Sequence, residues 1–162
     1  MFSEVCMKEG IRPATRSDAD AVLRLRQRAI LHGCAGHYPA ADLALWSQGA
    51  ASEAFLSDLE QHFYLLEQDG VLAGSGMVNL KDGRIDAIFT DPDWVGQGVA
   101  STLMMHLEAL ARAHGLAELT LDATLNAAPF YRRCGFVGEA QSQYHSPRGL
   151  ILDCVPMRKL LT

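Results

Sequence analysis

The stretch from Ile85 to Ser101 reads Ile-Asp-Ala-Ile-Phe-Thr-Asp-Pro-Asp-Trp-Val-Gly-Gln-Gly-Val-Ala-Ser, and it decides the fold. Its apolar, β-branched beginning is typical of a strand, Pro92 marks a turn, and an amphipathic helix follows Gly98. The glycines at this junction let the backbone bring several N–H groups close to one point. The helix adds its unpaired N–H groups and the positive end of its dipole. The stretch therefore predicts an anion site suited to a phosphate or pyrophosphate.

The composition is that of an ordinary folded protein. The chain has 162 residues, of which 49% are hydrophobic and 20% are charged, so we expect one domain over residues 1–162. A formal net charge of −5 argues against nucleic acid as a partner. No apolar run approaches the roughly 20 residues of a membrane span, and no signal peptide is evident, so we expect a cytoplasmic protein. The four cysteines lack C-x-x-C spacing, which argues against a zinc or other metal site and against a disulfide framework.

The residues before the deciding stretch predict a strand, several helices and then a strand meander. Ile11–Ala14 is expected to form a short strand, and Ser17 to cap a helix that ends at Gly33. A shorter helix and a further one after Ser52 should follow. The basic residues of the first helix are expected to face solvent: Arg24, Arg26 and Arg28.

Periodicity and turn residues place the remaining elements. Asp69-Gly70 predicts a hairpin, Val99–His114 a long helix, and Asn126 a cap for a short helix that contains Tyr131. The strands are expected at His62–Glu67, Val71–Asn79, Arg84–Thr90, Leu119–Ala123, Phe136–Gln143 and Leu150–Met157, with a turn at residues 146–149 between the last two. The long helix should connect two parallel strands. The predicted class is α/β (α+β), with a mixed central sheet that combines an antiparallel meander and a β-α-β unit.

Three kinds of loop compete for the glycine pair. A Walker A loop requires Gly-Lys-[Ser/Thr], and no lysine follows Gly98. A dinucleotide-binding loop is closer, because Asp122 ends the next strand, where a ribose-binding acid is expected. Against that alternative, Ser101 replaces the third glycine and a long meander precedes the loop. The third alternative is a turn that binds nothing.

Residues 89–100 resemble the acetyl-CoA loop, [Gln/Arg]-x-x-Gly-x-[Gly/Ala], of the GNAT superfamily of acetyl-CoA-dependent N-acetyltransferases. Residues 126–136, Asn-Ala-Ala-Pro-Phe-Tyr-Arg-Arg-Cys-Gly-Phe, are similar to the second signature of that family. The resemblance covers about residues 11–160 with the order of elements intact. It implies a single GNAT-like domain with helices on both faces of its sheet. One departure is Val95, which stands where the family has Gln or Arg, so we expect weaker or differently supported CoA binding.

The resemblance also implies where acetyl-CoA is held. The strand at residues 85–90 should diverge from the one at 119–123, with the pantetheine between them. The implied cofactor-binding residues are Ile88, Phe89, Thr90, Gly96, Gln97, Gly98, Val99, Ala100, Ser101 and Asn126. The first three would pair with the pantetheine through their backbone, and the loop residues would hold the pyrophosphate. Asn126 would bind the cofactor, cap its helix, or do both.

In the reaction that the resemblance implies, an amine attacks the thioester of acetyl-CoA directly. Tyr131 matches the family tyrosine that gives a proton to the leaving thiolate. A base is needed for the amine, and Asp86 is the first candidate, because strand alternation puts it on one face with Ile88 and Thr90. The other candidates are Asp82, His37 and His145.

The acceptor implied by the resemblance is a small-molecule amine or a protein amino group. Its pocket should be built from residues 33–61 and the C-terminal hairpin. A homodimer is also expected as an option, because dimers are common in the family. The alternative to an enzyme is a GNAT-like module that binds acyl-CoA as a sensor or partner without turnover.

Overall fold

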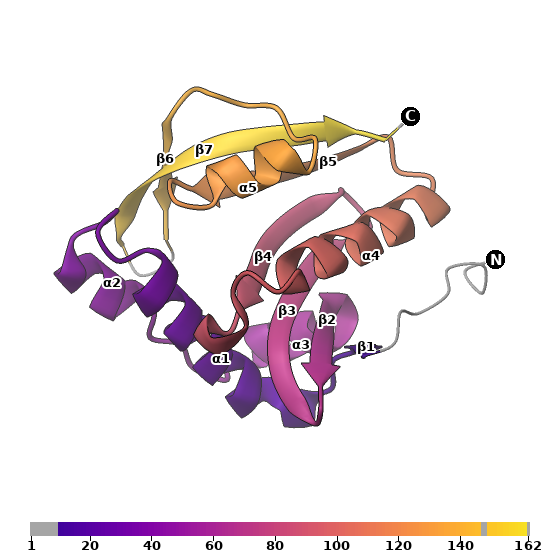
Figure 1. Cartoon of the computed structure of the whole chain (residues 1–162), viewed down its shortest axis with the longest axis horizontal. Coiled ribbons are helices and arrows are strands. Elements are labelled where there is room, and N and C mark those ends of the chain that lie inside the picture. The colour runs from indigo at the N-terminus through magenta and orange to yellow at the C-terminus, as the bar shows by residue number, and fades with distance from the viewer. Residues whose placement is uncertain (1–9, 147–148, 162) are drawn as a thin grey trace.

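The computed structural model describes residues 10–146 and 149–161, with a seven-stranded mixed sheet at its centre. The strands follow the order β1-β2-β3-β4-β5-β7-β6 across the sheet (Figure 1). They are β1 (Ile11–Pro13), β2 (Phe63–Gln68), β3 (Val71–Asn79), β4 (Arg84–Thr90), β5 (Glu118–Thr124), β6 (Ser142–His145) and β7 (Ile151–Leu160). Neighbouring strands are antiparallel except β4 and β5, which are parallel.

Helices cover both faces of this sheet (Figure 1). Residues of α4 and α5 share one core cluster with β3, β4, β5 and β7, whereas α1 and α3 pack with β2 in another. The helical elements are η2 (Arg16–Asp18), α1 (Ala19–Gly33), α2 (Ala40–Trp46), α3 (Glu53–His62), η3 (Pro92–Trp94), α4 (Val99–Ala113) and α5 (Ala128–Arg133). The predicted mixed sheet, meander and β-α-β unit are therefore confirmed. In the described part of the chain, no helix is long and apolar enough to cross a membrane.

The close contact between α4 and β3 depends on small residues in the strand. Leu103 and Leu107 lie one helical turn apart on α4 and are fully buried. A Cβ atom on Gly74 would lie 2.5 Å from Cγ1 of Val99, and one on Gly76 would lie 3.2 Å from Cδ1 of Leu107. The glycines therefore let the helix approach the sheet closely, which fixes where α4 begins.

The strands β4 and β5 diverge soon after they meet. Their parallel register consists of a single pair, Arg84 with Thr120. Beyond that pair, β4 continues to Thr90 and remains hydrogen-bonded to β3 only. The predicted separation of these strands is confirmed, and it leaves a strand-like gap in the middle of the sheet.

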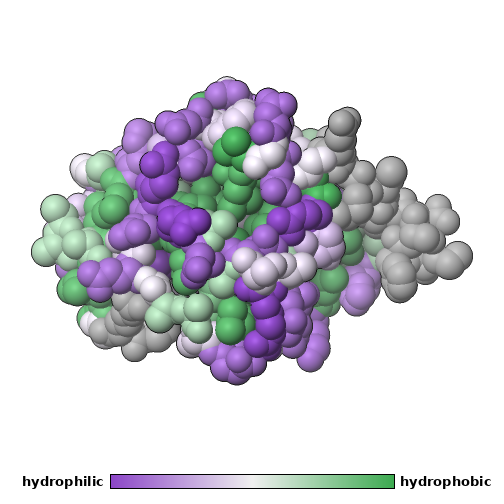
Figure 2. Space-filling model, turned by 90° about the horizontal axis from the view of Figure 1, so that it is seen from below, coloured by the Kyte–Doolittle hydropathy of each residue, from purple (hydrophilic) through white to green (hydrophobic). Residues whose placement is uncertain are grey.

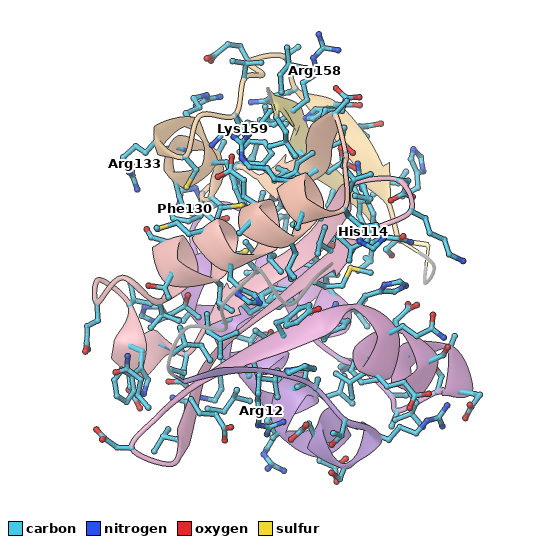
Figure 3. All side chains as sticks on the ribbon, turned by 90° about the vertical axis from the view of Figure 1, so that its right-hand side faces the viewer. Arg12, His114, Phe130, Arg133, Arg158 and Lys159 are labelled. Carbon is cyan, nitrogen blue, oxygen red and sulfur yellow. The ribbon has the colours of Figure 1, made fainter. Side chains whose placement is uncertain are left out.

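Side chains on β7 connect the two halves of the structure across this gap. The Lys159 Nζ atom donates to Glu108 of α4 at 2.7 Å and to the carbonyl oxygen of Cys134 at the end of α5, also at 2.7 Å. Lys159 therefore reaches from β7 to both helices on this face (Figure 3). The connection holds the β5–β7 half of the sheet against the helix that follows the glycine loop.

The start of α1 differs from the sequence prediction. Residues Arg16–Asp18 form a 3₁₀ turn, and α1 begins at Ala19 rather than after a Ser17 cap. The cap is a reciprocal box, in which Thr15 and Asp18 each accept, through the side chain, a hydrogen bond from the backbone N–H of the other. Asp18 is further held by Arg12, so this polar network replaces the expected serine.

The arginines of α1 are not all solvated as predicted. Arg26 donates to the carbonyl oxygens of Trp46 and Ser47 at 2.9 and 3.2 Å, and Arg28 binds Asp91. Only the Arg24 side chain is simply exposed. Sequence periodicity identified the outer face of α1 but not the loops that pack against it.

The closing strands also differ from their predicted bounds. Of the segment expected at 136–143, Val137 forms an isolated bridge to Arg158, and its last two residues begin β6, which is confined to Ser142–His145 and pairs with β7. Strand β7 extends to Leu160. Two residues of the predicted turn, 147 and 148, lie outside the described residues. Asn126 does not cap α5, whose N-cap is Ala127.

A buried histidine on α4 makes the fold sensitive to acid. The His106 side chain is 3% exposed, its Nε2 atom has no hydrogen-bond partner within residues 10–146 and 149–161, and its ring centroid lies 5.1 Å from that of Tyr64. Burial lowers the pKa of His106 below its usual value. The unfolded chain takes up a proton near pH 6.5, before the folded protein does. The stability that the neutral ring contributes is therefore complete above about pH 6.5 and declines as the pH falls below it.

We expect His106→Phe, which keeps a ring against Tyr64, to flatten this acid dependence. The unfolding midpoint of the wild type should fall more steeply between pH 7 and pH 5 than that of the variant, as followed by circular dichroism. His114→Gln is the matched control, because His114 is exposed at the end of the same helix and its replacement should leave the slope unchanged. Parallel slopes for the wild type and His106→Phe would contradict the assignment.

Candidate active site

A cavity of about 700 Å³ opens beside the divergence of β4 and β5. Its walls come from α1, α3 and the segment between them, from α5, and from β4, β5, β6 and β7. The predicted pocket segments, residues 33–61 and the C-terminal hairpin, therefore meet in one place. Seen from the side of α1 and α3, apolar side chains show between hydrophilic ones on the surface (Figure 2).

Tyr131 lines this cavity from α5, and it is packed by aromatic rings. Its ring centroid lies 5.2 Å from that of Phe130 and 5.9 Å from that of Phe136, both in edge-on geometry. The side chain is 8% exposed, and burial raises the pKa of Tyr131 well above its usual value. The phenol is therefore fully protonated at neutral pH, so it can donate a proton but not accept one.

Asn126 also lines the cavity, and one of its polar atoms has no protein partner. The Oδ1 atom is buried without a hydrogen bond among the described residues, whereas Nδ2 lies next to Gly33. A buried unpaired acceptor is costly unless a ligand supplies the donor. Of the two roles predicted for Asn126, helix capping is wrong, and the orphan oxygen fits a bound amide N–H.

Asp86 lies in the cavity wall, but it does not share its face of β4 with the residues that strand alternation predicted. A bulge in β4 leaves Asp86 without a partner on β3. Ile88 consequently packs in the same cluster as Ile85, on the α4 side, while Phe89 packs on the α1 side. The prediction that Asp86 shares a face with Ile88 and Thr90 is wrong, because the extra residue reverses the alternation.

A guanidinium group joins two carboxylates at the point where the strands separate. Arg84 Nη2 donates to Asp122 of β5 at 2.5 Å, and its Nε donates to Asp86 at 3.2 Å. Burial opposes the charge of Arg84, but the hydrogen bonds and charges of the two carboxylates raise its pKa. Sequence reasoning missed this group. The i, i+2 spacing of Arg84 and Asp86 on one strand was the available signal.

The other candidate bases lie away from the cavity wall. Asp82, His37 and His145 are exposed and do not line the cavity. The Asp82 carboxylate instead accepts from the backbone N–H of Arg84 in the β3–β4 turn. Of the candidates that the sequence offered, Asp86 is the one that the structure brings to the cavity.

A tyrosine missed by the sequence analysis connects the α1–α2 loop to the far wall. The Tyr38 hydroxyl donates to the carbonyl oxygen of Asp153 at 2.5 Å and accepts from the backbone N–H of Leu125 at 3.0 Å. Its ring lies 6.2 Å from that of Trp46. Tyr38 therefore closes one end of the cavity between α2, β5 and β7.

The glycine loop lies next to the cavity rather than inside it. Val95 lines the cavity, whereas residues 96–101 do not. Gly96 and Gly98 have φ angles of 83° and 81°, and a Cβ atom on either would meet no heavy atom within 4 Å among the described residues beyond its chain neighbours. The backbone here is open, and Gly98 is the N-cap of α4. These features fit the pyrophosphate of a donor whose chain enters the gap between β4 and β5.

Comparison with known proteins decides the family. Residues 34–161 match the model of the acetyltransferase (GNAT) domain. The chain belongs to the GNAT acetyltransferase family. The protein therefore transfers an acetyl group from acetyl-CoA to an amine acceptor, and the dinucleotide-binding and non-catalytic alternatives are set aside.

Individual relatives of this acetyltransferase agree with the assignment. The uncharacterized N-acetyltransferase YafP of Escherichia coli (strain K12) is 30% identical over 111 residues, which cover 67% of this chain and 68% of the relative. The peptidyl-lysine N-acetyltransferase YjaB of Salmonella typhimurium is 35% identical over 68 residues, 42% of this chain and 46% of the relative. A GCN5-related N-acetyltransferase from Rhodopseudomonas palustris has a crystal structure that superposes with a TM-score of 0.85 at 30% identity, covering 93% of this chain and 94% of that one.

We expect Gly98→Ala to abolish the thermal stabilisation that acetyl-CoA gives to the wild type. The added methyl group enters the open space in front of the loop and strains a left-handed residue by about 1–2 kcal/mol. Gly115→Ala is the matched control, because Gly115 lies just beyond the other end of α4 with a φ of 77° and equally open surroundings. Both variants should unfold at a lower temperature, but only Gly98→Ala should lose the acetyl-CoA shift. NAD should give no shift with any of them.

Proposed function

We propose that this acetyltransferase acts on a small amine that carries net positive charge. The single observation that supports this proposal is the charge of the cavity wall. Carboxylates outnumber basic groups there, with Asp58, Asp86, Asp122 and Asp153 against Arg26, His32 and Arg84. An anionic, partly apolar cavity attracts a cationic ligand and repels an acidic one.

Both arginines in the wall are already bound to protein groups. Arg26 donates to two backbone carbonyls, and Arg84 is held between two carboxylates. Asp58 and Asp153 of the cavity wall would pair with an ammonium group on the acceptor.

The remaining wall of the cavity suits an apolar stem. Aromatic rings line it from several elements: Tyr38, Trp46, Phe55, Phe63, Phe89 and Tyr144. Such rings bury alkyl or aryl groups and also attract cations through their faces. The combination favours an aliphatic or aromatic amine over a sugar phosphate.

Bound acetyl-CoA would supply the acetyl group as a thioester. The chain would hold this donor with the β4 edge at Ile88, Phe89 and Thr90, which has no partner on β5, and with the amide groups of residues 96–100. The Ser101 hydroxyl lies in the first turn of α4, beside those amide groups. The orphan Oδ1 of Asn126 would accept an amide N–H of the pantetheine.

Proton transfer would involve the two titratable residues assigned from the sequence. The Tyr131 hydroxyl would give its proton to the departing sulfur. Asp86 would receive a proton from the amine, directly or through water, and its negative charge would also draw the cation into the cavity. The hydrogen bond from Arg84 at 3.2 Å would orient the Asp86 carboxylate.

A lysine side chain of a protein is the second candidate acceptor. Strand β6 is the last strand of the sheet, all four of its residues are exposed, and Tyr144 within it lines the cavity. An extended peptide could pair with this edge and place a lysine in the cavity. The peptidyl-lysine specificity of one relative is consistent with this alternative.

A homodimer and a cytoplasmic location stay predictions.

We expect Tyr131→Phe to lower kcat by about 10²–10⁴ while the affinity for acetyl-CoA changes little. Phenylalanine keeps the ring contacts with Phe130 and Phe136, so the fold should be preserved. Release of free thiol measures the rate, and calorimetry measures donor binding. Tyr64→Phe is the control, because Tyr64 packs against α4 outside the cavity and its loss should leave kcat unchanged. An unaltered kcat in Tyr131→Phe would show that Tyr131 serves only in packing.

We expect an amine panel, read by mass spectrometry, to show highest kcat/KM for alkyl and aryl amines with a second positive charge. The panel should include monoamines, diamines, an amino sugar, its phosphate ester and a lysine peptide. Asp86→Asn should weaken the preference for dications, and it should also lower kcat at neutral pH if Asp86 is the base. Asp82→Asn removes the same charge outside the cavity and is the control. Preference for the phosphorylated sugar would reject the proposed acceptor, and preference for the peptide would favour the β6 alternative.

A further inference from the structure

The loop that precedes the glycine pair carries negative charge where an anion must bind. Asp91 and Asp93 lie within it, and the chain has no lysine or arginine from residue 85 to residue 111. Val95, the residue just before Gly96, is 58% exposed and adds no charge. A pyrophosphate that approaches residues 96–98 therefore meets the carboxylates of this loop, and neither the loop nor residues 99–111 of α4 supply a lysine or arginine to offset them.

A basic side chain from another element binds this loop. Arg28 of α1 donates from Nε and Nη2 to the two carboxylate oxygens of Asp91, both at 3.2 Å, and Nη2 lies 3.4 Å from Asp93. A two-pronged contact of this kind fixes direction as well as distance. Burial disfavours the charge on Asp91, but the hydrogen bonds from Arg28 and from the Asp93 backbone hold the pKa of that carboxyl below its usual value. The ion pair therefore persists at neutral pH.

Asp91 in turn organises the backbone that leads to the glycines. Its N–H donates to the carbonyl oxygen of Ala73 at 2.8 Å, its carboxylate accepts from the N–H of Asp93 at 2.9 Å, and its carbonyl accepts from Trp94 at 2.8 Å. The Gln97 side chain donates to the carbonyl oxygen of Asp93 at 3.3 Å. A chain of hydrogen bonds thus runs from Arg28 to the residue between the two glycines.

We propose that Arg28 is a positioning residue for the donor loop, which holds residues 91–98 in place and offsets the two carboxylates so that the loop can accept the pyrophosphate of acetyl-CoA. The proposal rests on the donor site assigned above. Helix α1 thus contacts both parts of the site. Several of its residues line the acceptor cavity, and Arg28 binds the donor loop.

The test compares donors with and without a pyrophosphate in calorimetric titrations. In Arg28→Gln, CoA should bind roughly tenfold more weakly at low salt, whereas S-acetylpantetheine should bind as it does to the wild type. Arg28→Lys should recover part of the loss. Asp93→Asn removes a carboxylate whose side chain is 81% exposed, so it should strengthen CoA binding, and the double variant Arg28→Gln/Asp93→Asn should return toward the wild-type affinity.

A measurement without ligand tests the positioning directly. Hydrogen exchange at the hydrogen-bonded amides of Asp91, Asp93 and Trp94 should be faster in Arg28→Gln than in the wild type, while the unfolding midpoint stays close to the wild-type value. Unchanged CoA affinity and unchanged exchange would overturn the proposal. Equal weakening of CoA and S-acetylpantetheine would also overturn it, because the effect would then not depend on the pyrophosphate. A wild-type protein that binds neither donor would instead reject the donor site itself.

Discussion

The divergence of β4 from β5 is the constraint on which the remaining structure depends. The two strands are paired at Arg84 and Thr120, and the β4 residues that follow pair with β3 on one side but have no strand partner on the β5 side. Backbone N–H and C=O groups in the interior of a sheet need hydrogen bonds. A chain that carries amides, such as pantetheine, can supply them as an added strand would. The same divergence opens the acceptor cavity on the α1 side, so one departure from regular pairing creates both halves of the site.

Cross-links on both faces of the sheet keep this gap at a fixed width. On the α4 side, Lys159 bonds to Glu108 and to the end of α5. On the α1 side, Tyr38 bonds to Leu125 and to Asp153. A rigid gap matters for catalysis because a thioester and an amine must meet within a small range of distances and angles. The cavity is thus shaped by residues that are remote from one another in sequence.

The features that depend on local backbone chemistry could be predicted from the sequence. The features that depend on contacts between distant segments were predicted wrongly. The Asp69-Gly70 hairpin, the glycine loop and the order of β4, α4 and β5 follow from residues within each segment, and the structure confirms them. The face of Asp86 was wrong because the bulge in β4 is a property of its pairing with β3. Asn126 resembled a helix cap, but its position beside Gly33 of α1 gives its side chain other surroundings.

This division also explains why the donor could be inferred from sequence and the acceptor could not. The donor contacts that we propose come mainly from backbone groups in continuous stretches, and glycines at 96 and 98 mark them without reference to the rest of the chain. The acceptor cavity depends on side chains from several elements, and the charge of Arg84 is offset in part by Asp122, which lies on another strand. Arg84 alone would suggest an anionic acceptor. Bonded to Asp86 and Asp122, it belongs to a group with net negative charge, and the expected acceptor becomes a cation.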